Sequence, residues 1–220
     1  KLLTPELFDE MSLEQMEKIY RERFADAGDF TFFIVGNLDE ATVKPLVEKY
    51  IGSLTDKPRT ENWKDNNEGM PKGKTVREIL IPLETEKANV VVVFNKDTKW
   101  SPETNMAMNV VRDVLRLRYT EEIREKEGGT YGVSVSAQNE KFPKNEKTLQ
   151  MSFDTDPAKA DYLKSIVYRE IGKLAKQGPT AEELDKVIKN ILKDREQAKP
   201  NNSYWMSVLT GYYQNGVNAD

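Results

Sequence analysis

The sequence predicts an α+β domain in which one mixed or antiparallel sheet carries helices packed on one face, a two-layer arrangement. Three observations lead to this prediction. The run VVVVF at Val90–Phe94 is the strongest strand pattern in the chain. Residues Leu149–Phe153 alternate apolar and polar side chains, as a half-buried strand does. Apolar residues at helical spacing precede and follow these strands and supply the second layer.

The N-terminal part of the sequence predicts one helix before and one helix after a single buried strand. Ser12–Ala25 has an apolar stripe behind a capping serine, which is typical of an amphipathic helix. Phe30–Val35, FTFFIV, is nearly all apolar and predicts a strand buried on both faces. Asp39 is expected to cap a second helix, which Pro45 either kinks or delays.

A polar stretch at about residues 55–73 contains several prolines and glycines and predicts an exposed connection. We expect it to separate sub-parts of a single domain covering residues 1–220, because the elements before it are too few for a core of their own. The chain opens on Lys1 without an initiator Met. We therefore expect a fragment of a longer multidomain protein.

Strands are expected next at Thr75–Leu83 and Ala88–Asn95, and Ser101 with its following proline predicts a helix start. Further helices are expected from Asp156, from Thr180 and over Ser203–Tyr213. The aromatic residues of the last helix are expected to pack in a core or to contact a neighbouring domain.

The stretch Arg116–Ala137 predicts a charged helix end, a two-glycine break and a strand that opens at Tyr131. Arg124 would lie in the last helical turns, so the turn folds the two side chains towards each other. A guanidinium beside a phenol forms a donor pair suited to a peptide carbonyl or to the oxyanion formed from it. Two structural interpretations stay open: Arg124 stabilises the helix C-terminus, and Tyr131 is half-buried sheet with the parity of Val133.

Two other interpretations of this stretch are weaker. The turn at Gly128–Thr130 lacks the lysine and the spacing of a phosphate-binding loop, and it follows a helix instead of preceding one. The acidic residues nearby could form an acid/base or metal cluster, but a solvated, salt-bridged helix end is favoured. These residues are Glu121, Glu122, Glu125 and Glu127.

The composition excludes several classes of function. Thirty-three basic and 37 acidic residues give a net charge of −4, so we expect no nucleic acid as a partner. No apolar run approaches the length of a membrane span. The absence of Cys and His excludes thiol nucleophiles, Ser-His-Asp catalysis and every His- or Cys-based zinc site. We therefore expect no metal or cofactor site in these 220 residues.

The segment REKEGGTYGV, residues 124–133, resembles the Arg/Tyr segment in the C-terminal half of pitrilysin-type (M16, inverzincin) zinc peptidases. The spacing of Arg124 and Tyr131, with six residues between them, is the same. The resemblance covers nearly the whole chain, through Glu22–Leu54, Phe153–Asp161 and Gly178–Val187. It implies an M16 metallohydrolase-like domain of the C-terminal type, without the H-x-x-E-H motif.

This resemblance implies a clamshell zinc metalloendopeptidase that hydrolyses unfolded peptides in a closed chamber. Its partners would be the peptide substrate and the upstream M16 domains of the same chain, one of which would bind zinc. Arg124 and Tyr131 would hold substrate carbonyls and the oxyanion, and the fragment alone would be inactive. Bacterial relatives are often exported, so a periplasmic location is expected over a cytoplasmic one. The alternative is a catalytically inactive M16-like structural or binding module.

Overall fold

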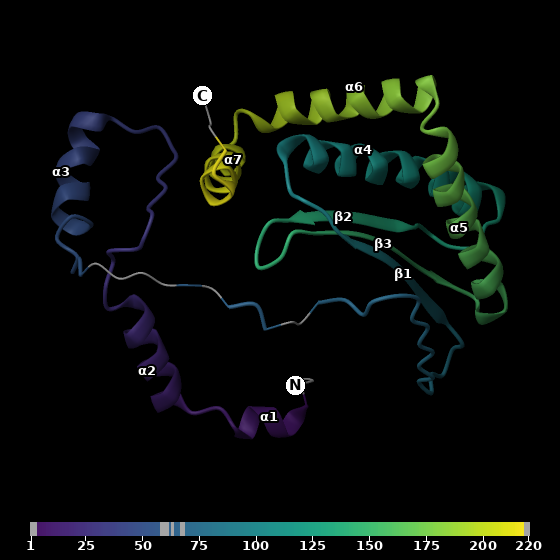
Figure 1. Cartoon of the computed structure of the whole chain (residues 1–220), viewed down its shortest axis with the longest axis horizontal. Helices are drawn as coiled ribbons and strands as arrows, with labels where there is room; N and C mark the ends of the chain where they lie inside the picture. The colour runs from purple at the N-terminus through teal and green to yellow at the C-terminus, as the bar shows by residue number, and fades with distance from the viewer. Residues whose placement is uncertain (1–3, 58–61, 63, 67–68, 218–220) are drawn as a thin grey trace. The chain divides into compact units, whose positions relative to one another are not determined.

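The computed structural model describes residues 4–57, 62, 64–66 and 69–217. Its sheet forms where the sequence has its clearest strand patterns: β1 spans Ala88–Asp97, β2 spans Ser134–Glu140 and β3 spans Glu146–Thr155. The strands are antiparallel and lie in the order β1-β3-β2 (Figure 1). The run VVVVF lies within β1, so the strand predicted there is confirmed.

Within residues 64–198, helices cover one face of the sheet, and side chains on the other face are exposed. Met151 of the central strand lies between Val92 of β1 and Val135 of β2, and both Met151 and Val92 are buried. Val91 and Val93 alternate onto the opposite face and are exposed. The predicted fold class, α+β with helices on one face of the sheet, is therefore confirmed.

The helical layer begins at caps that the sequence marks. It consists of α4 (Pro102–Tyr119), the short η2 (Pro157–Lys159), α5 (Ala160–Gln177) and α6 (Ala181–Ala198). Ser101 and Thr104 form a reciprocal capping box at the start of α4. Before α6, the Thr180 amide donates to Glu183 Oε2 at 2.7 Å, and the Glu183 amide donates to Thr180 Oγ1 at 3.1 Å.

The core lies between this helical layer and the sheet. Leu115, Tyr119 and Ile123 recur at four-residue intervals, and all three are fully buried. The Tyr119 hydroxyl donates to the Val167 carbonyl at 3.1 Å, and burial raises the pKa of this phenol. Other core residues come from β1, β3 and α5, or immediately precede β2: Val92, Val133, Met151, Phe153, Leu163, Ile166 and Val167. Val135 of β2 is partly buried and packs against them.

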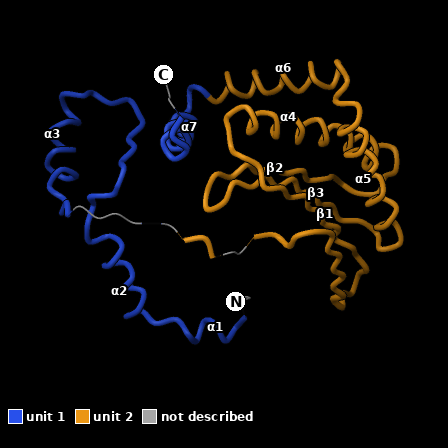
Figure 2. The backbone as a smooth tube through the Cα atoms, in the orientation of Figure 1, with its two compact units in different colours: residues 1–63, 199–220 blue, residues 64–198 orange. Residues whose placement is uncertain are grey.

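The chain divides into two compact units (Figure 2). Residues 64–198 hold the sheet and its helices, and residues 1–63 with 199–220 form the other unit. This division falls inside the predicted connection at about 55–73, of which residues 58–61, 63 and 67–68 lie outside the described part of the chain. A single domain over residues 1–220 stays a prediction.

In the residues that the structure describes, the second unit consists of helices and segments without regular secondary structure. Its helices are α1 (Pro5–Asp9), α2 (Leu13–Phe24), α3 (Glu40–Tyr50) and α7 (Asn202–Asn215). The predicted caps are confirmed, since Ser12 accepts from the Gln15 amide and Asp39 accepts from the Thr42 amide. Helix α3 starts at Glu40 and runs through Pro45, so the proline does not delay the helix.

Two predicted strands are wrong for the described residues. Phe30–Val35 and Thr75–Leu83 have no regular secondary structure, and neither belongs to a ladder with another strand. Phe32 and Ile34 in the first segment and Leu80 in the second are exposed rather than buried. Apolar, β-branched composition favours the extended backbone, but a strand also needs a neighbour that accepts its hydrogen bonds.

Candidate functional site

The charged helix end predicted before the two glycines is present, but its last turns widen. Helix α4 continues into η1 (Thr120–Lys126), a π-helix that contains Arg124. The wider turn keeps Ile123 in the core while Arg124 stays exposed. Short π-helical segments within α-helices are concentrated at functional sites.

The Gly128–Gly129 turn is fixed by hydrogen bonds and by close packing. Gly128 has φ of +55°, and its amide donates to the Arg124 carbonyl at 3.1 Å. The Gly129 carbonyl accepts from Thr155 Oγ1 at 2.6 Å, and this contact is buried. A Cβ on Gly129 would lie 2.5 Å from Leu163 Cδ1, so the backbone here approaches α5 as closely as a glycine allows.

Tyr131 follows this fixed turn and is fully exposed. Strand β2 begins at Ser134, so the expectation that Tyr131 opens the strand is wrong by three residues. The interpretation of Tyr131 as half-buried sheet is also wrong, although Val133 is buried as its parity predicted. Because hydrogen bonds tie Thr130 Oγ1 to Gly132 on the far side of Tyr131, the phenol projects from a short, locally bonded loop.

The Arg124 side chain is 55% exposed, and its Nε lies 3.7 Å from Glu125 Oε1, a loose ion pair at the surface. Neither Arg124 nor Tyr131 is sealed in the hydrophobic interior. The structure therefore presents a guanidinium and a phenol, one at each end of the Gly128–Gly129 turn, and leaves both able to donate to a ligand oxygen.

The acidic residues around the turn are paired, as the interpretation of a salt-bridged helix end predicted. Lys126 Nζ lies 3.0 Å from Glu121 and 2.5 Å from Glu122, and the hydrogen bond to Glu122 raises the pKa of this lysine. Glu122 also meets Arg169 of α5 at 2.7 Å. The Tyr162 hydroxyl donates to Glu127 at 3.0 Å, which raises the pKa of the phenol. Each carboxylate thus has a cationic or hydroxyl partner.

A second charged feature was not predicted from the sequence. Arg118 Nε and Nη2 donate to the two carboxylate oxygens of Glu183 at 2.6 and 2.9 Å. The two side chains are only 13% and 21% exposed. The hydrogen bond from Arg118 lowers the pKa of Glu183 to about 2. The capping box at Thr180 indicated the position of Glu183, but nothing in the sequence indicated its distant partner.

This ion pair lies in a groove of about 870 Å³ between α4 and α6. Its lining carries both signs of charge, including Arg116, Glu125, Lys186 and Asp194. Within the described residues no group of Asp or Glu could hold a metal ion, and no helix is both long and apolar enough to cross a membrane. With no His or Cys in the chain, the available donors do not fit a zinc site.

A family model described as the peptidase M16 inactive domain matches residues 10–191. The chain is 26% identical over 165 residues to the probable zinc protease PqqL of Haemophilus influenzae, a match that covers 74% of this chain and 17% of that protein. Thus the chain spans less than a fifth of that relative's length.

Solved structures match the fold. The crystal structure of the periplasmic protease PqqL from Escherichia coli superposes on 96% of this chain and 23% of its own, with a TM-score of 0.74 and 20% identity. A structure of the first half of the same Escherichia coli protein superposes on 93% of this chain and 45% of its own, with a TM-score of 0.58 and 15% identity.

Proposed function

This chain belongs to the peptidase M16 inactive-domain family, and on that premise we propose that it is the substrate-side domain of a zinc metalloendopeptidase. The resemblance found in the sequence is confirmed at the level of the family. The relative from Haemophilus influenzae is named a probable zinc protease, which supports proteolysis by the full-length protein. Because this chain spans only a small part of that relative, the reaction is proposed for the longer protein.

The role proposed for this chain rests on the exposed pair Arg124 and Tyr131. A peptide carbonyl accepts hydrogen bonds, and the oxyanion that forms during hydrolysis accepts them more strongly. The guanidinium and the phenol supply such donors from a turn that Thr155 and Leu163 hold in place. Because the backbone of the turn is fixed before the substrate arrives, less reorganisation is needed to bring these donors to the developing charge. The single observation that carries this role is the full exposure of Tyr131 beside a rigid turn.

Zinc, in this proposal, is bound by another domain, since the donor set of this chain does not fit the metal. When bound there, zinc would supply Lewis-acid chemistry at the scissile carbonyl. The residues of this chain would bind and orient the unfolded peptide in a chamber formed with the upstream M16 domains.

Two comparisons support a place in the C-terminal half of the longer protein. The complete Escherichia coli structure fits this chain better than its first half alone does, with TM-scores of 0.74 and 0.58. Because this chain matches the complete structure better than the first half, we infer that a second copy of the fold lies outside the first half. The same Escherichia coli protein is described as periplasmic, which supports a periplasmic location for this protein.

The test is Tyr131→Phe in the full-length protein, assayed on an unfolded peptide. Removing one oxyanion donor is expected to lower kcat by on the order of 10²–10³ while the zinc content stays unchanged. Tyr162→Phe is the matched control, because this exposed phenol is bonded to Glu127 and lies outside the proposed pair. Wild-type turnover by Tyr131→Phe would remove the phenol from the mechanism.

The second candidate is a catalytically inactive structural or binding module, with which the description of the family as an inactive domain is equally consistent. The two candidates differ upstream of this chain. An H-x-x-E-H motif with a later glutamate in the full-length protein supports the peptidase, and a full-length protein without that motif, which binds no zinc, supports the module.

A further inference from the structure

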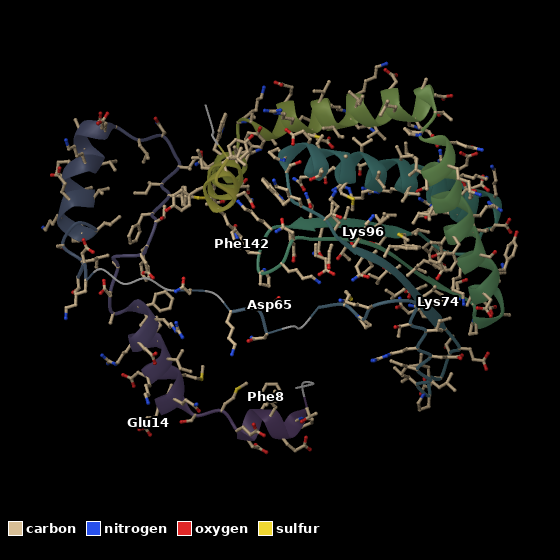
Figure 3. The ribbon with its side chains drawn as sticks, in the orientation of Figure 1. Phe8, Glu14, Asp65, Lys74, Lys96 and Phe142 are labelled. Carbon is tan, nitrogen blue, oxygen red and sulfur yellow. The ribbon has the colours of Figure 1, made fainter. Side chains whose placement is uncertain are left out.

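The unit formed by residues 1–63 and 199–220 lacks a buried core in its described part. All the buried apolar residues lie between Val92 and Val187, in the other unit. Helices α1, α2, α3 and α7 contain no buried residue. Phe8 on α1 is exposed (Figure 3), as are Leu13 and Tyr20 on the apolar stripe of α2. Apolar surface on this scale marks an interface.

The segment Phe30–Val35 has the side-chain alternation of a strand with only one face covered. On one face, Thr31 Oγ1 donates to the Tyr213 hydroxyl at 2.7 Å, and the Phe33 ring meets the Tyr213 ring edge-on at 5.5 Å. Phe32 and Ile34 alternate onto the other face and are 47% and 49% exposed. Helix α7 therefore covers one side of the segment.

The backbone of this segment also has no strand partner within the described residues. Within the described part of the chain, no backbone hydrogen bond joins residues 31–35 to another strand. The composition, aromatic and β-branched on both faces, is that of a strand inside a sheet rather than at its edge. Unpaired amides and carbonyls on such a segment are a template for another strand.

We propose that Phe30–Val35 is a strand of a β-sheet whose other strands come from a segment of the full-length polypeptide outside these 220 residues. The occupant must offer a strand edge to the backbone and an apolar surface to Phe32 and Ile34. The relatives are long enough to contain such a segment, since the match to this chain covers only 17% of one relative and 23% of another. The proposal does not depend on proteolysis, and an inactive module would show the same pairing.

Hydrogen exchange read by mass spectrometry tests the proposal on the full-length protein and on the 220-residue chain. Amides 31–35 are expected to exchange at least about 100-fold more slowly in the full-length protein than in the shorter chain, because a ladder must open before they exchange. Amides of β1 are the internal control, because β1 pairs with β3 within this chain and is expected to be protected in both proteins.

Equal exchange of residues 31–35 in the two proteins would overturn the proposal. Protection in the shorter chain that rises with concentration, together with a dimer in solution, would also overturn it, by assigning the pairing to a second copy.

A variant in the full-length protein gives a second test. Ile34→Asp is expected to speed exchange of residues 31–35 at least about tenfold, because a buried charge opposes docking of the sheet. Ile34→Val is the matched control and keeps an apolar, β-branched side chain, so exchange should stay near the wild-type rate. Unchanged protection in Ile34→Asp would show that no apolar layer covers this face.

Discussion

Glu183→Gln tests the reasoning about the charged contact between α4 and α6. In the wild type, Glu183 accepts two hydrogen bonds from Arg118 and one from the Thr180 amide. The Arg118 guanidinium also approaches the Gly178 carbonyl at 3.4 Å. The amide keeps the size of the carboxylate but removes its charge, and it leaves a guanidinium that is only 13% exposed without its counter-ion.

The magnitude follows from the pKa of Glu183, which Arg118 chiefly, together with hydrogen bonds from Thr180, lowers from 4.5 to about 2. A shift of this size corresponds to about 3 kcal/mol of stability at neutral pH. Because the folded pKa lies below the unfolded one, this stability is present above about pH 4.5 and is lost as the pH falls towards 2. The difference between wild type and Glu183→Gln is therefore expected to shrink from about 3 kcal/mol at pH 7 to near zero at about pH 2.

The assay is urea unfolding followed by far-UV circular dichroism at several pH values between 7 and 2.5. Glu182→Gln is the matched control, because it removes an acidic charge from the same helical turn, and its carboxylate is exposed. This control is expected to change the free energy of unfolding by less than about 0.5 kcal/mol. A stability difference for Glu183→Gln that stays constant across this range would refute the argument, as would a neutral effect at pH 7.

Two further substitutions probe the packing around the candidate site. Gly129→Ala would place a Cβ 2.5 Å from Leu163 Cδ1 and is expected to destabilise the protein by about 1–3 kcal/mol in urea unfolding. Unchanged stability would mean that α5 shifts to make room for the added Cβ. Tyr119→Phe removes the hydroxyl that donates to the buried Val167 carbonyl at 3.1 Å and is expected to cost about 1 kcal/mol in the same assay. Equal stability of Tyr119→Phe and wild type would show that this hydrogen bond makes no net contribution.

The sequence correctly predicted the features that depend on residues close together along the chain. The caps at Ser12, Ser101 and Thr180 form as predicted, because an N-cap needs only a side chain and an amide three residues away. The left-handed Gly128 was predicted for the same reason. The alternation in β3 was also sufficient, because β3 finds partners on both sides within this chain.

The features that the sequence did not predict depend on contacts far along the chain. FTFFIV has the composition of a buried strand, but composition does not say which segment supplies the neighbouring strand. The pairing of Arg118 with Glu183 joins residues 65 positions apart. The parity of Tyr131 with Val133 wrongly indicated a half-buried side chain. Strand β2 starts only at Ser134, so its alternation does not extend back to Tyr131, which is exposed.

The full exposure of Tyr131 has a consequence for natural variation. A phenol that buries none of its surface contributes little to folding, so mutational drift at this position should be free of any penalty in stability. By contrast, Gly129 cannot drift without disturbing Leu163. If tyrosine nevertheless persists among orthologues as strictly as this glycine, the selective pressure that keeps it must come from a ligand.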